Sequence, residues 1–225
     1  FAAALSAARL GAKVLLLVNP HAPFGTLLSA DLLQSVLSAF PGLVLVDEAY
    51  VDFVDPRVKH DLVPMTQRVP NLLLLRSMSK GYSLAGLRFG YGIGSRGVVE
   101  PMLTKTKDSY NTDIVAQTLA TAALRARATA AQTWETVRRD RETLREGLEA
   151  LGFDVPASHT NFLLAALSPA QKQRRGAKAL YEALKADGIL VRYFPYPPLD
   201  DSLRISVGTD AQNHALLSAL GKLCT

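Results

Sequence analysis

The stretch LLLLRSMSKGYSLAGLRFG, residues 72–90, joins a short apolar run to a polar loop. Four successive leucines are typical of a strand that is buried on both faces of a parallel sheet. The hydroxyls of Ser77 and Ser79 and the amine of Lys80 follow directly beyond this strand. Because open α/β sheets bind ligands at the carboxyl ends of their strands, this loop predicts a functional site.

The polar groups of the loop suit a ligand that carries an aldehyde and a phosphate. Lys80 supplies an amine nucleophile, and the serines and Arg88 supply donors for phosphate oxygens. Pyridoxal phosphate carries both of these groups. The small residues near Lys80 are Gly81, Ser83, Ala85 and Gly86. They favour close packing against a ligand over the alternative of a solvated surface lysine.

Two earlier apolar runs predict two further strands of the same sheet. They are KVLLLV, residues 13–18, and LVLV, residues 43–46. Asp47 directly follows the C-terminal end of the second run, and Tyr50 lies three residues further on. If the sheet is parallel, these polar groups reach the same edge as Lys80.

The segments between these runs predict the rest of the N-terminal part. A short helical pattern covers residues 2–9, and apolar residues at helical spacing after a Ser29 cap predict a second helix. Residues 89–94 predict a fourth strand, whereas residues 52–70 are less regular. Strands separated by helical segments imply right-handed parallel crossovers.

After Pro101 the pattern changes to longer helices and a mixed C-terminal segment. A helix is expected from a cap near Asp113 to about Arg127, and a second helix is closed by Gly152. The elements expected beyond it are a strand at residues 161–165, a helix at 170–187, strands at 189–192 and 203–207, and a final helix after Asp210. This order predicts a small α+β domain.

Several spaced motifs resemble those of one enzyme family. The pattern Ser-x-Ser-Lys-x5-Gly-x-Arg-x-Gly at residues 77–90, preceded by Asp47-Glu48-Ala49-Tyr50, is similar to the fold-type I pyridoxal-phosphate aminotransferases. Within them it resembles the histidinol-phosphate aminotransferases most, from about Gly11 to the C-terminus. The family carries a further stretch before the point that matches Phe1.

The resemblance implies an α/β fold of the fold-type I transferase class with two domains. The large domain, residues 1–130, has a mostly parallel sheet flanked by helices and is expected to be incomplete at its N-terminus. A linking helix and a small α+β domain follow at residues 131–225.

The resemblance also implies the residues that bind the cofactor, pyridoxal 5'-phosphate. They are the Schiff-base lysine Lys80, Asp47 beside the pyridine nitrogen, Tyr50 beside the phenolic oxygen, and Ser77, Ser79 and Arg88 around the phosphate. Asp47, Tyr50 and Lys80 are the catalytic residues of this set. The structural alternatives are an ion pair for Asp47, core packing for Tyr50, and turns or caps for the serines.

Two arginines near the C-terminus match substrate-binding positions of the family. Arg204 matches the arginine that binds an α-carboxylate, and Arg192 matches one that reaches the substrate phosphate. An edge-strand salt bridge is the structural alternative for Arg204.

One turn departs from the family pattern. The family turn reads Asn-Pro-x-Asn-Pro-Thr-Gly, but Ala22 stands in place of the second asparagine and Phe24 in place of the threonine. Tyr50 is then the donor that remains for the phenolic oxygen of the cofactor. We expect His21 to be a turn residue rather than a catalytic one.

The resemblance implies a transamination that interconverts L-histidinol phosphate and imidazole acetol phosphate, with glutamate and 2-oxoglutarate as the other pair. It places this reaction in histidine biosynthesis and implies a homodimer. An aromatic aminotransferase and a threonine-phosphate decarboxylase are alternatives with the same cofactor. A third alternative, of another class, is an inactive remnant that lacks the N-terminal stretch.

Composition excludes several other classes of protein. The 225 residues are 48% hydrophobic and 20% charged, which is ordinary for a globular protein, and no apolar run reaches membrane-spanning length. The single cysteine, Cys224, leaves no cysteine-rich metal site, and no metal is expected. The net charge of +5 does not predict nucleic-acid binding, because the basic residues at 138–146 alternate with acidic ones. We expect a cytoplasmic protein.

Overall fold

The computed structural model describes residue 6 and residues 9–224, so most of the helix expected at residues 2–9 lies outside the described residues. The chain forms two compact units, each with its own core. The N-terminal unit comprises the described residues up to Pro20 together with Leu27–Trp134, and the C-terminal unit comprises His21–Thr26 and Glu135 onward. The expected domain division at residue 130 stays a prediction.

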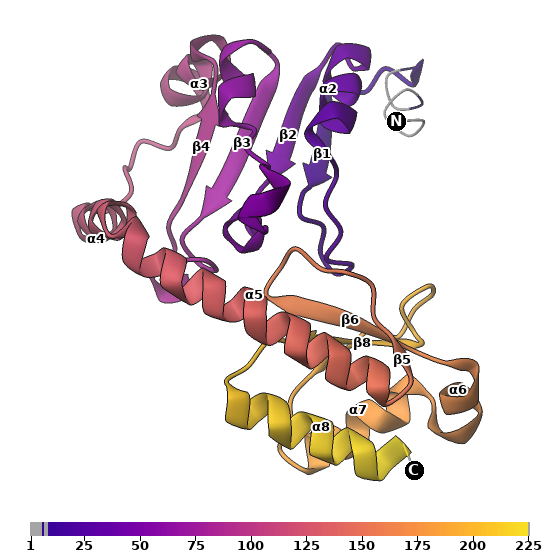
Figure 1. Cartoon of the computed structure of the whole chain (residues 1–225). Helices are drawn as coiled ribbons and strands as arrows, with labels where there is room; N and C mark the ends of the chain where they lie inside the picture. Colours follow the sequence, from indigo (N-terminus) through magenta and orange to yellow (C-terminus); the bar gives the residue numbers. More distant parts are fainter. Residues whose placement is uncertain (1–5, 7–8, 225) are drawn as a thin grey trace. The chain divides into compact units, whose positions relative to one another are not determined.

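The N-terminal unit contains a sheet in the order β1-β2-β3-β4 (Figure 1). The strands are β1 (Val14–Val18), β2 (Leu43–Asp47), β3 (Leu72–Ser77) and β4 (Gly90–Gly94). β1, β2 and β3 are parallel, as the sequence predicts, whereas β4 is antiparallel to β3. The expectation of a parallel crossover is therefore wrong for β4. Only a single 3-10 turn, η4 (Ala85–Leu87), lies between β3 and β4, and without a crossover helix the chain folds back along β3.

One face of this sheet packs on α2 (Ala30–Ala39) and on the segment before β3. Ser29 caps α2, since its hydroxyl accepts a hydrogen bond from Leu32 N at 3.2 Å. The less regular segment forms three 3-10 turns, η1 (Val51–Phe53), η2 (Pro56–Val58) and η3 (Val63–Gln67). The buried core residues are Leu33, Leu37, Phe40, Val44, Val46, Leu62, Met65, Leu72 and Leu74.

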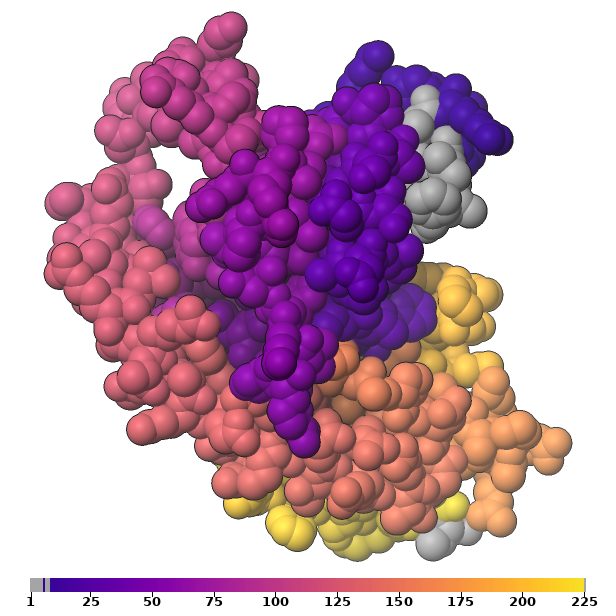
Figure 2. All heavy atoms as spheres, turned by 45° about the horizontal axis from the view of Figure 1, so that its top comes forward, coloured from indigo at the N-terminus to yellow at the C-terminus, as the bar shows by residue number. Residues whose placement is uncertain are grey.

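Helices follow β4 in the order α3 (Arg96–Pro101), the π-helical turn η5 (Met102–Thr106), α4 (Ile114–Arg125) and α5 (Arg127–Ala150). Asp113 caps α4, as predicted, by accepting a hydrogen bond from Ala116 N at 2.8 Å. The segment that carries η5 and α4 lies at the surface in Figure 2, where it is drawn in pink. It exposes large apolar side chains, among them Ile114, Val115 and Leu119.

The C-terminal unit contains an antiparallel sheet in the order β5-β6-β8-β7. Its elements are β5 (Phe153–Asp154), β6 (Phe162–Leu167), α6 (Pro169–Arg175), α7 (Ala177–Ala186), β7 (Arg192–Tyr193), β8 (Ser202–Ser206) and α8 (Asp210–Cys224). The core between sheet and helices includes Leu144, Leu148, Leu163, Leu180, Leu203 and Leu220. This is the predicted α+β arrangement, although Gly176 divides the single helix expected at residues 170–187.

Among the described residues, no helix is long and apolar enough to cross a membrane.

Candidate active site

Asp47 and Lys80 follow neighbouring parallel strands. Asp47 is the last residue of β2 and lies opposite Leu75 of β3, five residues before Lys80. The Asp47 side chain is half-buried, and its Oδ1 accepts a hydrogen bond from Ala49 N at 2.9 Å. The parallel register therefore places both functional groups after the carboxyl ends of adjacent strands.

Lys80 lies in a short loop and its side chain is exposed. The Nζ atom of Lys80 lies 5.8 Å from the centroid of the Tyr50 ring. Within the loop, the carbonyl of Lys80 accepts from Ser83 N at 3.1 Å, and Leu84 N donates to the Met78 carbonyl at 3.0 Å. The structure thus brings together Lys80 and Tyr50, which are 30 residues apart in sequence.

The three residues expected around a phosphate lie at the two ends of this loop. Ser77 Oγ accepts from Ser79 N at 3.0 Å, so these two serines share one turn after β3. Arg88 follows η4 with a backbone φ of +55°, and its Nη1 donates to the Ala85 carbonyl at 2.9 Å. Ser77 also pairs with Gly90 in the β3–β4 register, so the antiparallel return brings Arg88 back toward the serines.

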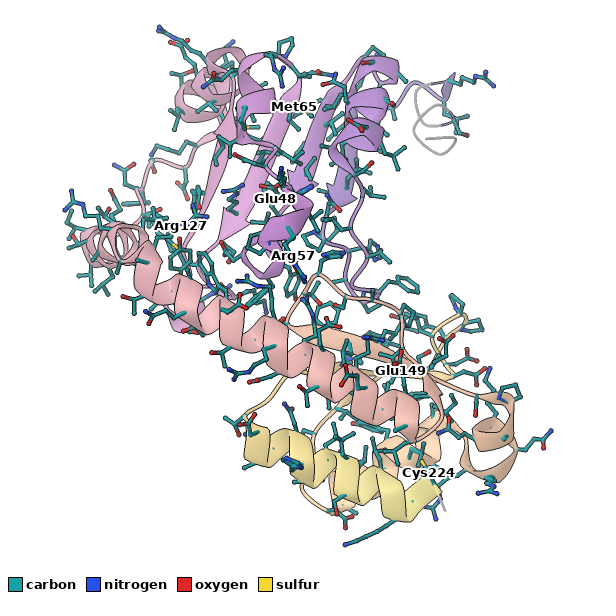
Figure 3. All side chains as sticks on the ribbon, in the orientation of Figure 1. Glu48, Arg57, Met65, Arg127, Glu149 and Cys224 are labelled. Atoms are coloured by element: carbon teal, nitrogen blue, oxygen red, sulfur yellow. The ribbon has the colours of Figure 1, made fainter. Side chains whose placement is uncertain are left out.

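A buried charge cluster that the sequence interpretation missed begins at Glu48, next to Asp47 (Figure 3). The Glu48 side chain is fully buried, and its Oε2 accepts from Arg76 Nε at 2.8 Å. His60 Nε2 lies 3.8 Å from Glu48 Oε1 and is also buried. A buried carboxylate requires a cationic neighbour, here Arg76, because an isolated charge is costly to remove from water.

Asp52 belongs to the same region and packs against the residue that follows Lys80. Burial raises the pKa of the Asp52 carboxyl to about 6; the positive charges of Arg76 and Arg127 oppose this rise, and the negative charge of Glu48 adds to it. A Cβ atom on Gly81 would lie 2.6 Å from Asp52 Cγ, which is too close for any other residue type. Gly81 is therefore required by close packing rather than by a positive φ.

Arg192 and Arg204 lie directly opposite each other on β7 and β8 of the C-terminal unit. The Cζ atoms of Arg192 and Arg204 lie 5.5 Å and 5.8 Å from the centroid of the Phe194 ring. Arg204 also lies over Phe162, at 5.1 Å. Among the described residues neither arginine forms a salt bridge, which argues against the alternative of an edge-strand ion pair.

The turn that departs from the family pattern is held by its backbone. His21 N donates to the Thr26 carbonyl and Gly25 N donates to the His21 carbonyl, at 2.8 and 2.7 Å. Gly25 is buried against Ser158, and its carbonyl accepts from His159 N at 2.8 Å. His21 is thus a turn residue, as expected from the sequence.

The motif identifies Lys80, whereas its buried neighbours could not be recognised so directly. Asp52 lies in an irregular segment, Arg76 ends an apolar run, and Glu48 stands within the motif at residues 47–50 without a role being assigned to it. Trp134, which donates a hydrogen bond to the Gly81 carbonyl, offered two signals: it is the single tryptophan of the chain, and it lies on the apolar face of a predicted helix. Its partner lies 53 residues away, so the sequence does not reveal the contact.

Known proteins are similar to this chain over nearly its whole length. Histidinol-phosphate aminotransferase of Microcystis aeruginosa is 45% identical over 212 residues, which cover 94% of this chain and 58% of that protein. Histidinol-phosphate aminotransferase 1 of Trichormus variabilis is 40% identical over 210 residues, which cover 93% of this chain and 57% of that protein. The chain therefore spans less than two thirds of the length of these relatives.

A solved structure supports the same relationship. The crystal structure of histidinol-phosphate aminotransferase from Sinorhizobium meliloti in complex with pyridoxal-5'-phosphate matches with a TM-score of 0.87 and 26% identity, over 97% of this chain and 59% of that one. The fold is therefore that of the fold-type I pyridoxal-phosphate enzymes. The family described as aminotransferase class I and II matches residues 1–220. This chain belongs to the class I and II aminotransferase family.

Proposed function

We propose that the protein to which this chain belongs is a pyridoxal-phosphate-dependent histidinol-phosphate:2-oxoglutarate aminotransferase. The observation that carries the proposal is the placement of Lys80 beside Tyr50, after the strand adjacent to the one that ends in Asp47. The identity of 45% to a histidinol-phosphate aminotransferase supports the choice of substrate.

The donor set of the N-terminal unit fits pyridoxal phosphate. The exposed amine of Lys80 is available to hold an aldehyde, and the turn of Ser77 and Ser79 with Arg88 offers donors for phosphate oxygens. Asp47 uses Oδ1 for Ala49 N, which leaves Oδ2 for a protonated ring nitrogen. When bound, the cofactor supplies an electron sink for the substrate's Cα.

The residues of this chain then have separate tasks. Asp47 keeps the ring nitrogen protonated, and the Tyr50 hydroxyl donates to the phenolic oxygen. Lys80 Nζ would hold the aldehyde of the cofactor, and when free it would accept the proton from the substrate's Cα.

The paired arginines of the C-terminal unit support an anionic substrate. Like charges directly opposite on adjacent strands repel each other, and among the described residues neither Arg192 nor Arg204 forms a salt bridge. A phosphate or carboxylate bound by both would relieve that repulsion. Histidinol phosphate carries such a phosphate, and glutamate and 2-oxoglutarate carry carboxylates.

The cofactor assignment is tested by labelling the purified chain. With added pyridoxal phosphate we expect a visible absorbance band, and borohydride should then fix the label, which peptide mapping should locate on Lys80. Lys80→Arg should abolish the band, while the control Lys105→Arg, at an exposed lysine of η5, should keep it. Label spread evenly over the exposed lysines would contradict the proposal.

The substrate assignment is tested on protein that shows the visible band with pyridoxal phosphate and has not been treated with borohydride. Histidinol phosphate should react in preference to phenylalanine, and Arg192→Ala should raise KM for histidinol phosphate by roughly 10- to 100-fold, as expected for a lost charge-assisted hydrogen bond. KM for phenylalanine should change little. Preference for phenylalanine would indicate an aromatic aminotransferase, and release of carbon dioxide from threonine phosphate would indicate a decarboxylase.

A homodimer in the cytoplasm belongs to the same proposal. The exposed apolar side chains Ile114, Val115 and Leu119 on α4 support an interface, because apolar side chains gathered on one exposed helix often mark a site of protein association. Sedimentation equilibrium measures the state of association.

A further inference from the structure

A long-range hydrogen bond holds the peptide that follows Lys80. Trp134 Nε1 donates to the Gly81 carbonyl at 2.5 Å, although the two residues are 53 positions apart. The Trp134 side chain is 4% exposed, so the bond is shielded from water. A buried indole N–H normally requires such a partner, and the contact is therefore a stable part of the fold.

Two neighbours fix the position of the indole ring. The Tyr82 ring meets it edge to face, with centroids 5.4 Å apart and an angle of 83°. The guanidinium Cζ of Arg127 lies 5.6 Å from the ring centroid, from the first turn of α5 (Figure 3). Trp134 is thus held by its own helix and by the loop that it contacts.

Gly81 is confined on a second side by Asp52. A Cβ atom on Gly81 would lie 2.6 Å from Asp52 Cγ and 2.7 Å from Asp52 Cβ, so the Asp52 side chain fills the space beside Gly81. The peptide after Lys80 therefore lies between a carboxylate side chain from η1 and an indole N–H from α5.

Several other hydrogen bonds of the loop come from nearby residues. The Lys80 carbonyl accepts a hydrogen bond from Ser83 N. The Met78 carbonyl accepts one from Leu84 N, and Met78 N donates one to the Phe89 carbonyl. These bonds define a turn, but they do not tie it to a distant element. The bond from Trp134 joins the loop to α5.

We propose that Trp134 is a positioning residue for Lys80. The inference rests on the proposed function, in which Lys80 Nζ must meet an aldehyde and later a proton at defined places. Functional groups of this kind require their supporting residues to hold them to within about 0.5 Å. Loss of the indole N–H leaves the buried Gly81 carbonyl without its partner, and the loop then samples further arrangements.

The test compares Trp134→Phe with a matched control on the same helix. Phenylalanine keeps an aromatic ring but removes the donor, whereas Leu144→Ala removes a fully buried side chain of α5 in the core of the C-terminal unit. Each chain receives limiting pyridoxal phosphate and then borohydride. The first readout is the label on Lys80 relative to the exposed Lys105 and Lys178, and the second is the visible circular dichroism per bound cofactor.

We expect Trp134→Phe to lower both readouts by roughly three- to tenfold, the change that corresponds to one buried hydrogen bond. Leu144→Ala should leave both readouts unchanged at temperatures where it is folded. Values for Trp134→Phe equal to those of the unaltered chain would overturn the inference, and so would an equal fall in both variants. If the unaltered chain shows no preference for Lys80, the proposed function itself fails, and this inference fails with it.

A measurement on the unaltered chain covers the case in which Trp134→Phe does not fold. The indole proton should exchange slowly with solvent in nuclear magnetic resonance spectra, and its resonance should move when pyridoxal phosphate is added. Rapid exchange, or a resonance that does not respond while Lys80 is labelled, would overturn the inference.

Discussion

At the scale of single residues, Asp52 shows how burial changes the chemistry of an acid. Its pKa rises to about 6 because desolvation outweighs the attraction of Arg76 and Arg127. Between its usual value of 3.8 and this raised value, the folded chain retains a proton that the unfolded chain has released. The contribution of Asp52 to the free energy of unfolding is therefore largest below that window and is lost as pH rises through it.

Asp52→Asn should remove this loss, because the amide stays neutral at every pH. We expect the variant to match the unaltered chain near the acid end of the window and to be more stable at neutral pH, by about 1–3 kcal/mol. Urea unfolding at both pH values measures the difference. Asp108→Asn, at an exposed aspartate, is the control, and a gain for Asp52→Asn that does not vary with pH would contradict the assignment.

The residues of the candidate site could be predicted to different degrees. Lys80 and Asp47 could be predicted, because each follows an apolar strand and belongs to a spaced motif. The proximity of Glu48 and His60 could not be predicted, since these buried side chains are 12 residues apart along an irregular part of the chain. A sequence reports local pattern directly, whereas the partner of a buried charge depends on how distant segments pack.

At the scale of elements, the helix caps were predictable and the direction of β4 was not. Ser29 and Asp113 are followed by helical patterns, and each accepts the expected hydrogen bond. β4 shows the opposite case. Its glycines, Gly90, Gly92 and Gly94, give a weak pattern, and its direction follows from the shortness of η4 rather than from its own residues.

The cap of α6 provides a prediction at this scale. Ser168 Oγ accepts from Gln171 N at 3.4 Å and Gln171 Oε1 accepts from Ser168 N at 2.9 Å, which is a complete capping box. Ser168→Ala should lower the free energy of unfolding by about 1 kcal/mol. Ser35→Ala, in the middle of α2, should have no such cost, because alanine is the better helix former there. Chemical denaturation measures both, and equal effects would contradict this role of Ser168.

At the scale of the whole molecule, the two compact units have separate cores. The sequence predicts a helix that links two parts, and the division at residue 130 stays a prediction. In the structure residues 21–26 group with the C-terminal unit, because Gly25 is buried against Ser158 and its carbonyl accepts a hydrogen bond from His159 N. A segment of six residues carries too little pattern to reveal such a contact.

Separate cores predict separate responses to core substitutions. Leu144→Ala should destabilise the C-terminal unit by about 2–5 kcal/mol, because Leu144 is fully buried there. Amide hydrogen exchange in β6 and β8 should then accelerate, while exchange in β2 and β3 should stay nearly constant. Leu74→Ala, in the core of the N-terminal unit, is the reciprocal control. Equal acceleration throughout both units would show that they unfold as one.

The bond between Trp134 and Gly81 also gives the protein an optical property. Because the chain contains one tryptophan, all of its indole fluorescence comes from the ring that contacts the peptide after Lys80. That emission overlaps the absorption of pyridoxal phosphate, so energy transfer should dim it whenever the cofactor is held nearby. The protein therefore carries its own fluorescent reporter of the lysine loop, and no external dye is required to follow it.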